Sequence, residues 1–148
     1  MGEPEQTLAE KTYRAVGRFM FEFSQVEYSI RHYLAEQIGL DEEHFVAVVE
    51  SYEVGPLCSV AIEVFTKSRT KESAVRIKHH INHFRRLDEE RKRVAHELWL
   101  PSQEGESVHY VSHGGPKTTL SPNQAEALEQ LADETRALRS ELEKAFRS

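Results

Sequence analysis

The sequence SAVRIKHHINHFRRLDEERKRVAHEL, residues 73–98, forms most of a long helical pattern that begins near Thr70 or Ser73. Its apolar side chains return mostly at steps of three and four residues, which places them on one face of an α-helix. They are Ala74, Ile77, Ile81, Phe84, Leu87, Val94 and Leu98. Leu100-Pro101 is expected to end this helix, because the residue before a proline avoids helical geometry. The pattern predicts a helix that buries one face against other helices.

Two further helical patterns precede this one. The first is expected from about residue 5 to 37, with Gly39 at its natural stop and Asp41 as the N-cap of the next segment. The second covers about residues 42–68. Gly55-Pro56 predicts a break or kink within it, because proline cannot continue an upstream helical ladder.

The remaining chain predicts an extended segment and a last helix. Val108–Ser112 and Thr118–Leu120 flank His113-Gly114-Gly115-Pro116, which indicates a short β-hairpin or an extended loop. Ser121 then resembles a helix cap, with Pro122 at the first helical position and Gln124 completing a capping box. Four long helical segments joined by short links predict an all-α fold, a four-helix up-down bundle of one domain spanning residues 1–148.

Composition restricts the class of protein. The chain has 148 residues, enough for one core, and 30% of them are charged, which suits long amphipathic helices. Cys58 is the only cysteine, so an intramolecular disulfide and a four-thiol zinc site are excluded. No apolar run approaches the ~20 residues that cross a bilayer, and residues 1–11 do not resemble a secretory signal. We therefore expect a cytoplasmic protein without membrane contact.

The charge is unevenly distributed. The whole chain carries a formal net charge of −6, whereas residues 67–96 hold ten lysines and arginines against four acids, a net charge of +6. A basic segment on an acidic body indicates an anion-binding surface, although a solvated helix face gives the same pattern. The bases of this segment that we expect to contact phosphate groups, besides Arg91, are Arg85, Arg86, Lys92 and Arg93.

Several motifs for metals and nucleotides are missing. Gly114-Gly115 lacks the pattern of a phosphate-binding loop, and His96-Glu97 has no second histidine at the zinc-protease spacing. His79 and His83 are four residues apart and could share a metal ion on one helix face, but a third ligand would have to come from elsewhere. Exposed histidines on a basic helix explain the pair better. We expect no metal and no cofactor.

Arg91 and His96 enclose four residues near the end of the helical pattern. An arginine is always charged and places two donors on a phosphate, and a histidine exchanges a proton near neutral pH. Together they could cleave an RNA phosphodiester without a metal ion: the 2′-hydroxyl attacks phosphorus, histidine moves a proton and arginine stabilises the phosphorane charge. Structural roles are the alternative, with Arg91 paired to a carboxylate such as Glu27 and His96 capping its helix.

Helical geometry complicates this pair. Five steps along a straight helix turn the two side chains about 140° apart, so Arg91 and His96 do not share a face. Lys92 and Arg93 lie four and three residues before His96 and face it better. Which of the three bases contacts phosphate is left open by the sequence.

The sequence resembles the HEPN family of helical-bundle proteins. The resemblance rests on the Arg91-to-His96 spacing, on Val94-Ala95-His96 followed by Leu98-Trp99, and on the four-helix layout with a hairpin before the last helix. The aromatic first helix, with Glu27 in Phe23-Ser24-Gln25-Val26-Glu27-Tyr28, is also similar. The match covers nearly the whole chain, but its sharp motif is six residues long.

The resemblance implies a function. Many HEPN proteins are metal-independent endoribonucleases of toxin–antitoxin or phage-defence systems, and they act as homodimers with both motifs lining a shared cleft. By that resemblance Arg91 and His96 are the catalytic pair, Glu27 supports them, RNA is the substrate, and an antitoxin or defence-system protein is a partner. Some family members lack activity, so the alternative is a non-catalytic helical module that dimerises or binds a protein or nucleic acid.

Overall fold

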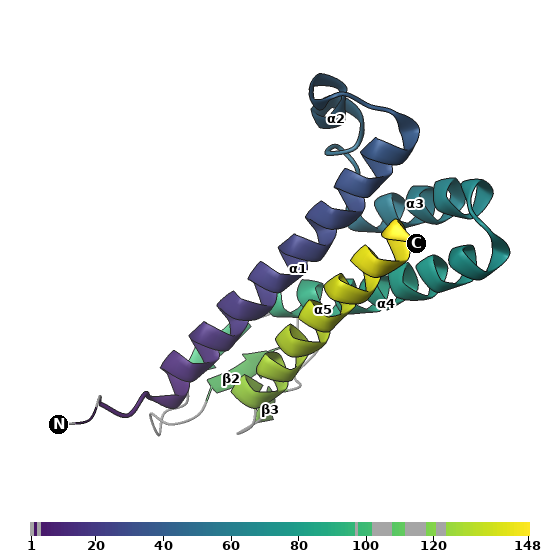
Figure 1. The fold of residues 1–148 in the computed structure, drawn as a ribbon. Coiled ribbons are helices and arrows are strands. Elements are labelled where there is room, and N and C mark those ends of the chain that lie inside the picture. The colour runs from purple at the N-terminus through teal and green to yellow at the C-terminus, as the bar shows by residue number, and fades with distance from the viewer. Residues whose placement is uncertain (1, 3, 97, 102–107, 112–117, 121–123) are drawn as a thin grey trace.

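The computed structural model describes residues 2, 4–96, 98–101, 108–111, 118–120 and 124–148, and for His96 and the strands it describes the backbone alone. The fold is predominantly helical, as predicted (Figure 1). Its described part contains five helices: α1 (Leu8–Ile38), α2 (Glu42–Val48), α3 (Val54–Ser68), α4 (Lys71–His96) and α5 (Gln124–Arg147). The predicted cap at Ser121 and Pro122 lies outside the described residues.

Local chemistry at both ends of α1 explains its bounds. Thr7 and Glu10 form a reciprocal capping box, in which each side chain accepts a hydrogen bond from the other residue's backbone N–H. Gly39 ends the helix with a φ of 72°, a left-handed conformation that glycine adopts without a steric penalty. Asp41 caps α2 by accepting from the amide of His44 at 2.9 Å. The predicted stop at Gly39 and the predicted cap at Asp41 are confirmed.

The predicted break at Gly55-Pro56 is wrong in position. The helix is interrupted between Val48 and Val54, and Gly55-Pro56 lies in the first turn of α3. A proline is tolerated there, because the first amides of a helix have no intrahelical partner. The second helical region is therefore two helices, which gives one helix more than the sequence predicts.

The end of α4 also differs from the prediction. The helix ends at His96, and Leu98–Pro101 forms strand β1 instead of continuing it. β1 pairs antiparallel with β2 (Val108–Val111), which pairs antiparallel with β3 (Thr118–Leu120). Leu98 is opposite Val111, and β1 is an edge strand of the sheet. The segment 112–117, where the sequence predicts the turn, lies outside the described residues.

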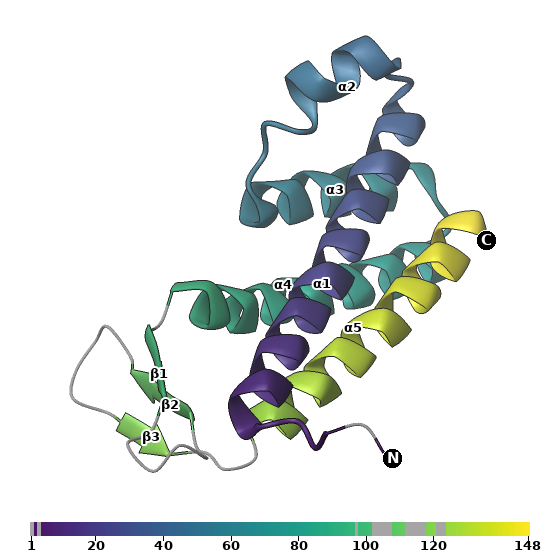
Figure 2. The same cartoon turned by 90° about the vertical axis from the view of Figure 1, so that its left-hand side faces the viewer.

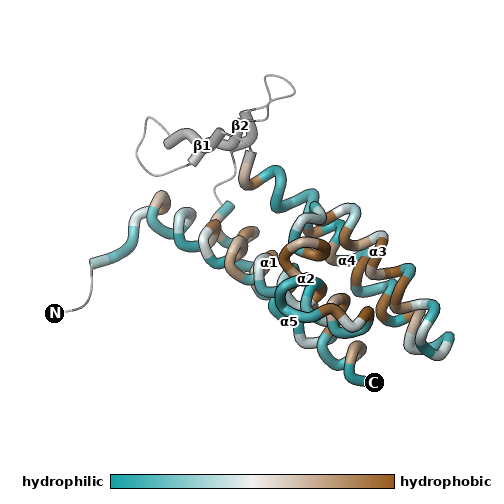
Figure 3. The backbone as a smooth tube through the Cα atoms, turned by 90° about the horizontal axis from the view of Figure 1, so that it is seen from above, coloured by the Kyte–Doolittle hydropathy of each residue, from teal (hydrophilic) through white to brown (hydrophobic). Residues whose placement is uncertain are grey.

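The helices pack around a shared core. α1 lies along α5, and α4 packs against both α3 and α5 (Figures 1 and 2). α2 and the three strands lie at opposite ends of α1 (Figure 2). Figure 3 shows hydrophobic residues alternating with hydrophilic ones along the long helices, as expected when each buries one face.

The predicted apolar face of α4 is buried over its described length, from Ala74 to Val94. Phe84 of this face stacks on Phe23 of α1, with ring centroids 4.6 Å apart. This aromatic pair joins α1 to α4 beneath the site described below. No helix in the described part of the chain combines the length and apolar character needed to span a membrane.

Candidate functional site

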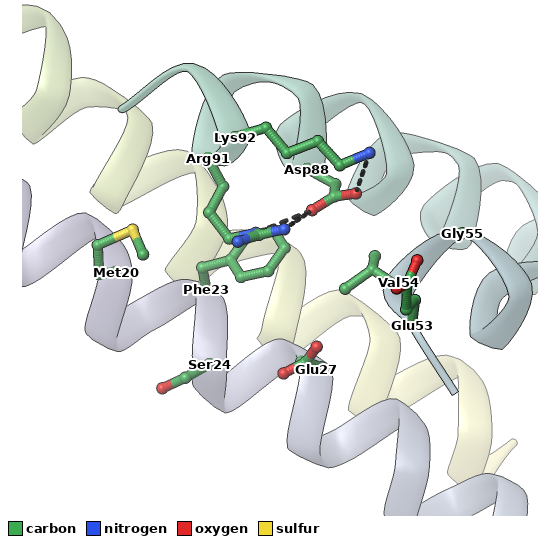
Figure 4. Close-up of a pocket in the computed structure, with 10 residues that line it drawn as sticks. All are labelled: Met20, Phe23, Ser24, Glu27, Glu53, Val54, Gly55, Asp88, Arg91 and Lys92. Atoms are coloured by element: carbon green, nitrogen blue, oxygen red, sulfur yellow. Dashed lines mark hydrogen bonds and ion pairs between the residues drawn. The ribbon is translucent and has the colours of Figure 1, made fainter. Parts of the chain in front are cut away.

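A cavity of about 510 Å³ lies between α1, the first turn of α3 and the C-terminal half of α4 (Figure 4). Arg91 and Lys92 enter it from α4, together with Asp88. The other side chains come from α1 and from the start of α3. The lining residues of those two elements are Met20, Phe23, Ser24, Glu27, Glu53, Val54 and Gly55.

Asp88 is the organising residue of this cavity. It is 2% exposed, although a carboxylate is almost never buried without partners. Its Oδ1 accepts a hydrogen bond from Nε of Arg91 at 2.8 Å and lies 2.7 Å from Nη2 of the same guanidinium. Its Oδ2 lies 3.4 Å from Nζ of Lys92. Asp88 therefore holds two cations of α4 at the cavity.

Arg91 is fixed on two sides. Its guanidinium carbon lies 5.1 Å from the ring centroid of Phe23, a cation–π contact, and its side chain is 23% exposed. Figure 4 shows the guanidinium lying over that ring with one edge turned to Asp88. Among the described residues Nη1 has no partner. The contacts with Asp88 and Phe23 thus set the orientation of the guanidinium.

Lys92 is the more accessible cation. Its side chain is 49% exposed, and Nζ lies between Asp88 and Glu89, the latter at 3.6 Å. The negative charge of Asp88, followed by its hydrogen bond and the charge of Glu89, raises the pKa of Lys92. Lys92 therefore stays protonated throughout the physiological range and provides a fixed positive charge at the rim of the cavity.

The other predicted phosphate contacts do not join this site. Arg93 pairs with Glu90 at 3.2 Å on another face of α4. Arg85 donates to Oγ of Ser59 on α3 at 2.8 Å. Arg86 is exposed and has no ion pair with any described residue. Of the expected bases the structure brings together Arg91 and Lys92, while Arg85, Arg86 and Arg93 lie apart from the cavity.

Glu27 lines the cavity but does not pair with Arg91, so the expected partner of Arg91 is corrected to Asp88. Oε1 of Glu27 instead lies 3.2 Å from Nη2 of Arg31. Arg31 also donates to the backbone oxygens of Val49 at 2.6 Å and Tyr52 at 2.7 Å. Arg31 thereby fastens the segment between α2 and α3 to α1, and this places the start of α3 at the cavity.

His96 is the last residue of α4, and its side chain lies outside the described part of the structure. Its backbone lies one turn beyond Lys92, and ideal helical geometry puts these two positions on neighbouring faces. Arg91, five residues earlier, is turned about 140° away on a straight helix. Lys92 is therefore the cavity cation whose position is best placed for joint action with His96.

Asp88 was missed by sequence reasoning, although a signal for it existed. It lies four residues after Phe84, at a position on the buried face, and three and four residues before two cations. An acid among apolar positions at that spacing predicts a buried ion pair. Asp88 stands in a run of charged residues, so in the sequence it resembles a solvated acid.

His79, His80 and His83 of α4 do not form a metal site with other described side chains. His83 pairs through Nε2 with Glu134 of α5, whereas His79 is exposed. Burial, followed by the charge of His79, lowers the pKa of His80. Within the described ranges, no group of three or more histidine, cysteine, aspartate or glutamate side chains could hold a metal ion.

Comparison with models of protein families, with curated proteins and with solved structures gives no match for this chain. The likeness to the HEPN family rests on the residues of this sequence, chiefly Arg91 and His96 with the apolar residues around them.

Proposed function

We propose that the protein is a HEPN-like, metal-independent endoribonuclease that cleaves RNA through attack of the 2′-hydroxyl. The observation that supports it is the buried carboxylate of Asp88, which gathers Arg91 and Lys92 at an open cavity one turn before His96. Burying the carboxylate of Asp88 costs free energy unless well-placed cations compensate its charge. The two cations that do so, Arg91 and Lys92, also line an open cavity, and this arrangement suits the binding of a phosphate.

The chemistry needs three groups. The 2′-oxygen attacks phosphorus and loses its proton, the bond from phosphorus to the 5′-oxygen breaks, and the leaving oxygen takes up a proton. Neutral His96 accepts the proton of the 2′-hydroxyl, and the imidazolium formed in this way donates that proton to the leaving 5′-oxygen. Nη1 of Arg91 and Nζ of Lys92 stabilise the negative charge of the phosphorane. The products carry a 2′,3′-cyclic phosphate and a 5′-hydroxyl.

The proposal includes a fold and an assembly. α1, α3, α4 and α5 are the four helices of a HEPN-type bundle, α2 is an added short helix, and β2 with β3 is its hairpin. The up-down order expected from the sequence is corrected, because α1 and α5 lie side by side and run in the same direction, with Arg18 beside Glu129 and Tyr33 beside Phe146. The protein acts as a homodimer in the cytoplasm. An exposed aromatic stripe on α1 supports the dimer: Tyr13, Phe21 and Tyr28 are 67%, 60% and 61% exposed. Helical geometry puts them within roughly 80° of one another.

This aromatic stripe also borders the cavity. Met20, Ser24 and Glu27 line the cavity from α1, and helical geometry places them next to the stripe on that helix. Exposed apolar patches mark protein contacts on otherwise polar surfaces. A second copy packed on the stripe would bring its own α1 next to the cavity of the first. That arrangement would bring groups of both subunits towards one RNA strand.

The same stripe favours the second candidate function, a non-catalytic helical module. In that case the aromatic stripe binds another protein, such as an antitoxin or a component of a defence system, and the cations of α4 bind nucleic acid or only stabilise the helix. The two candidates differ in whether His96 is needed for a chemical step.

The test is cleavage of a mixed, labelled RNA pool in the presence of EDTA. We expect His96→Ala and Arg91→Ala each to lower the cleavage rate by roughly 100-fold. The matched controls are His79→Ala and Arg86→Ala, which remove exposed residues of α4 outside the cavity and should leave the rate unchanged. Folded native protein without cleavage would favour the non-catalytic module.

A further inference from the structure

The cavity has two sides of opposite charge. Arg91 and Lys92 form the basic side on α4, and Glu27 and Glu53 form the acidic side on α1 and α3 (Figure 4). The charge of Asp88 is not counted with either side, because both of its carboxylate oxygens already face Arg91 or Lys92. A simple polyanion would be repelled by the acidic side. A ligand that fits must present hydrogen-bond donors at one end and a negative charge at the other.

Glu53 is unusual for its position. It is the N-cap of α3, with φ −69° and ψ 165°, yet its side chain makes no capping hydrogen bond. Serine, threonine, aspartate and asparagine are the preferred residues there because their short side chains reach the free amides. Glu53 is exposed, and its side chain has no hydrogen-bond or ion-pair partner among the described residues, although its backbone oxygen accepts from the amide of Leu57 at 2.9 Å. Both oxygens of its carboxylate are therefore available to a molecule in the cavity.

The position of Glu53 is nevertheless fixed by the protein. The preceding residue, Tyr52, is held through its backbone oxygen by Arg31, and the following residue, Val54, is buried in the core. Gly55 adds no side chain, and nothing lies within 4 Å of the place where its Cβ would be. Space thus remains beside a carboxylate whose two neighbouring residues in the chain are both held by contacts with the rest of the protein.

We propose that this cavity reads a guanine base of the RNA substrate, with Glu53 as the residue that determines specificity. The proposal rests on the proposed nuclease function and names its substrate preference. Guanine presents two neighbouring donors, N1–H and the N2 amino group, which match the two oxygens of one carboxylate. Uracil has one N–H donor on that edge, and adenine has an acceptor at N1. The apolar side chain of Val54 lies beside Glu53 and would contact the base.

The phosphate of the same nucleotide then lies at the basic side of the cavity. Arg91 offers Nη1 and Lys92 offers its ammonium group there, so a single nucleotide satisfies both sides. The volume of about 510 Å³ is within the usual range for small-molecule pockets, roughly 300–1,000 Å³. The charge distribution thus matches a guanosine monophosphate better than it matches a bare phosphate.

The experiment compares binding of guanosine and adenosine 3′-monophosphates, which carry the phosphate that the 2′-hydroxyl attacks, to the full chain by NMR or calorimetric titration. We expect the native protein to bind the guanine nucleotide roughly 10-fold or more tightly than the adenine nucleotide, since hydrogen bonds to a charged group contribute about 1.5–3 kcal/mol. Glu53→Gln should abolish this preference, because an amide offers a donor where guanine needs a second acceptor. Glu50→Gln, an exposed glutamate of the same segment outside the cavity, should retain it.

Equal affinities, no binding of either nucleotide, or a preference that survives Glu53→Gln would overturn the inference. The binding assay involves no cleavage, so its outcome is separate from that of the nuclease test. Cleavage of RNA without a guanine preference would contradict the role of Glu53 and leave the nuclease proposal standing. Guanine-selective binding without any cleavage would support the role of Glu53 and contradict the nuclease proposal.

Discussion

Arg91 and Asp88 lie one turn apart on α4, and two nitrogens of the guanidinium, Nε and Nη2, approach the same carboxylate oxygen at 2.8 and 2.7 Å. This ion pair lies against the Phe23 ring, so the carboxylate is buried while the arginine remains partly open. Helix α4 therefore carries exposed charges on one face and the buried charge of Asp88 on another. The candidate site depends on this buried charge.

The first prediction concerns the stability that Asp88 provides. Asp88→Asn retains the shape of the side chain and removes its charge, which leaves Arg91 and Lys92 without their shared partner. We expect the free energy of unfolding in urea to fall by about 2 kcal/mol, below the usual cost of breaking a buried pair because both cations can reach water. Glu89→Gln removes an exposed partner of Lys92 and should change it by less than about 0.5 kcal/mol. Equal effects of the two variants would contradict the central role of Asp88.

The second prediction concerns Arg31, whose side chain is 12% exposed. Arg31→Met keeps much of the apolar stem and removes the donors to Val49 and Tyr52. We expect a loss of roughly 2 kcal/mol in stability, since two backbone oxygens lose a charged donor. Hydrogen exchange of the amides of residues 49–53 should also become faster. Arg14→Met, an exposed arginine of the same helix, is the control, and unchanged exchange in Arg31→Met would argue against the clamp.

The helical part of this fold could be predicted because its signals are local. The apolar spacing from Ala74 to Val94 identifies the buried face of α4, and Gly39 and Asp41 mark a stop and a start through their own backbone chemistry. Gly55-Pro56 misled because proline breaks a helix interior and is equally compatible with a first turn. The true start at Glu53 has no preferred capping residue to announce it.

The site could be predicted only in part, because its geometry depends on residues far apart in the chain. The basic character of α4 follows from the sequence, but the sequence does not separate Arg91 and Lys92, which line the cavity, from the other bases of this helix. The role of Arg31 does not follow from the sequence, because its acceptors are backbone oxygens 18 and 21 residues away, which carry no side-chain signal. The contact between Arg31 and Tyr52 also places Glu53 at the cavity. The spacing of residues in the sequence therefore could not predict that Glu53 lies near α4.

The third prediction concerns pH and Cys58, which is fully buried. Burial raises the pKa of this thiol to about 11, from an ordinary value of 9.0. Between pH 9 and pH 11 the thiol therefore keeps its proton in the folded state and loses it in the unfolded state. The free energy of unfolding should fall as pH rises from about 9 to about 11. Cys58→Ala should lack this component of the pH dependence. A thiol reagent should label native Cys58 at pH 8 only as fast as the protein unfolds; rapid labelling of folded protein would contradict the burial.

The fourth prediction concerns self-association through the aromatic stripe of α1. We expect native protein to be a dimer by light scattering at micromolar concentration, and Phe21→Ser with Tyr28→Ser to be a folded monomer. Both rings are exposed in the single chain, so their loss should cost the monomer little stability. Val75→Ser, which removes a 60% exposed side chain of α4, should remain dimeric. A native monomer, or a dimer that survives both substitutions, would exclude this interface.

The central claim is metal-independent cleavage by 2′-hydroxyl attack, and the end groups of the products test it most directly. A labelled RNA pool incubated with native protein and EDTA should give fragments with 2′,3′-cyclic phosphate and 5′-hydroxyl ends, and His96→Ala should give about 100-fold fewer. Fragments with 5′-phosphate ends, cleavage that EDTA abolishes, or equal yields from native protein and His96→Ala would contradict the account.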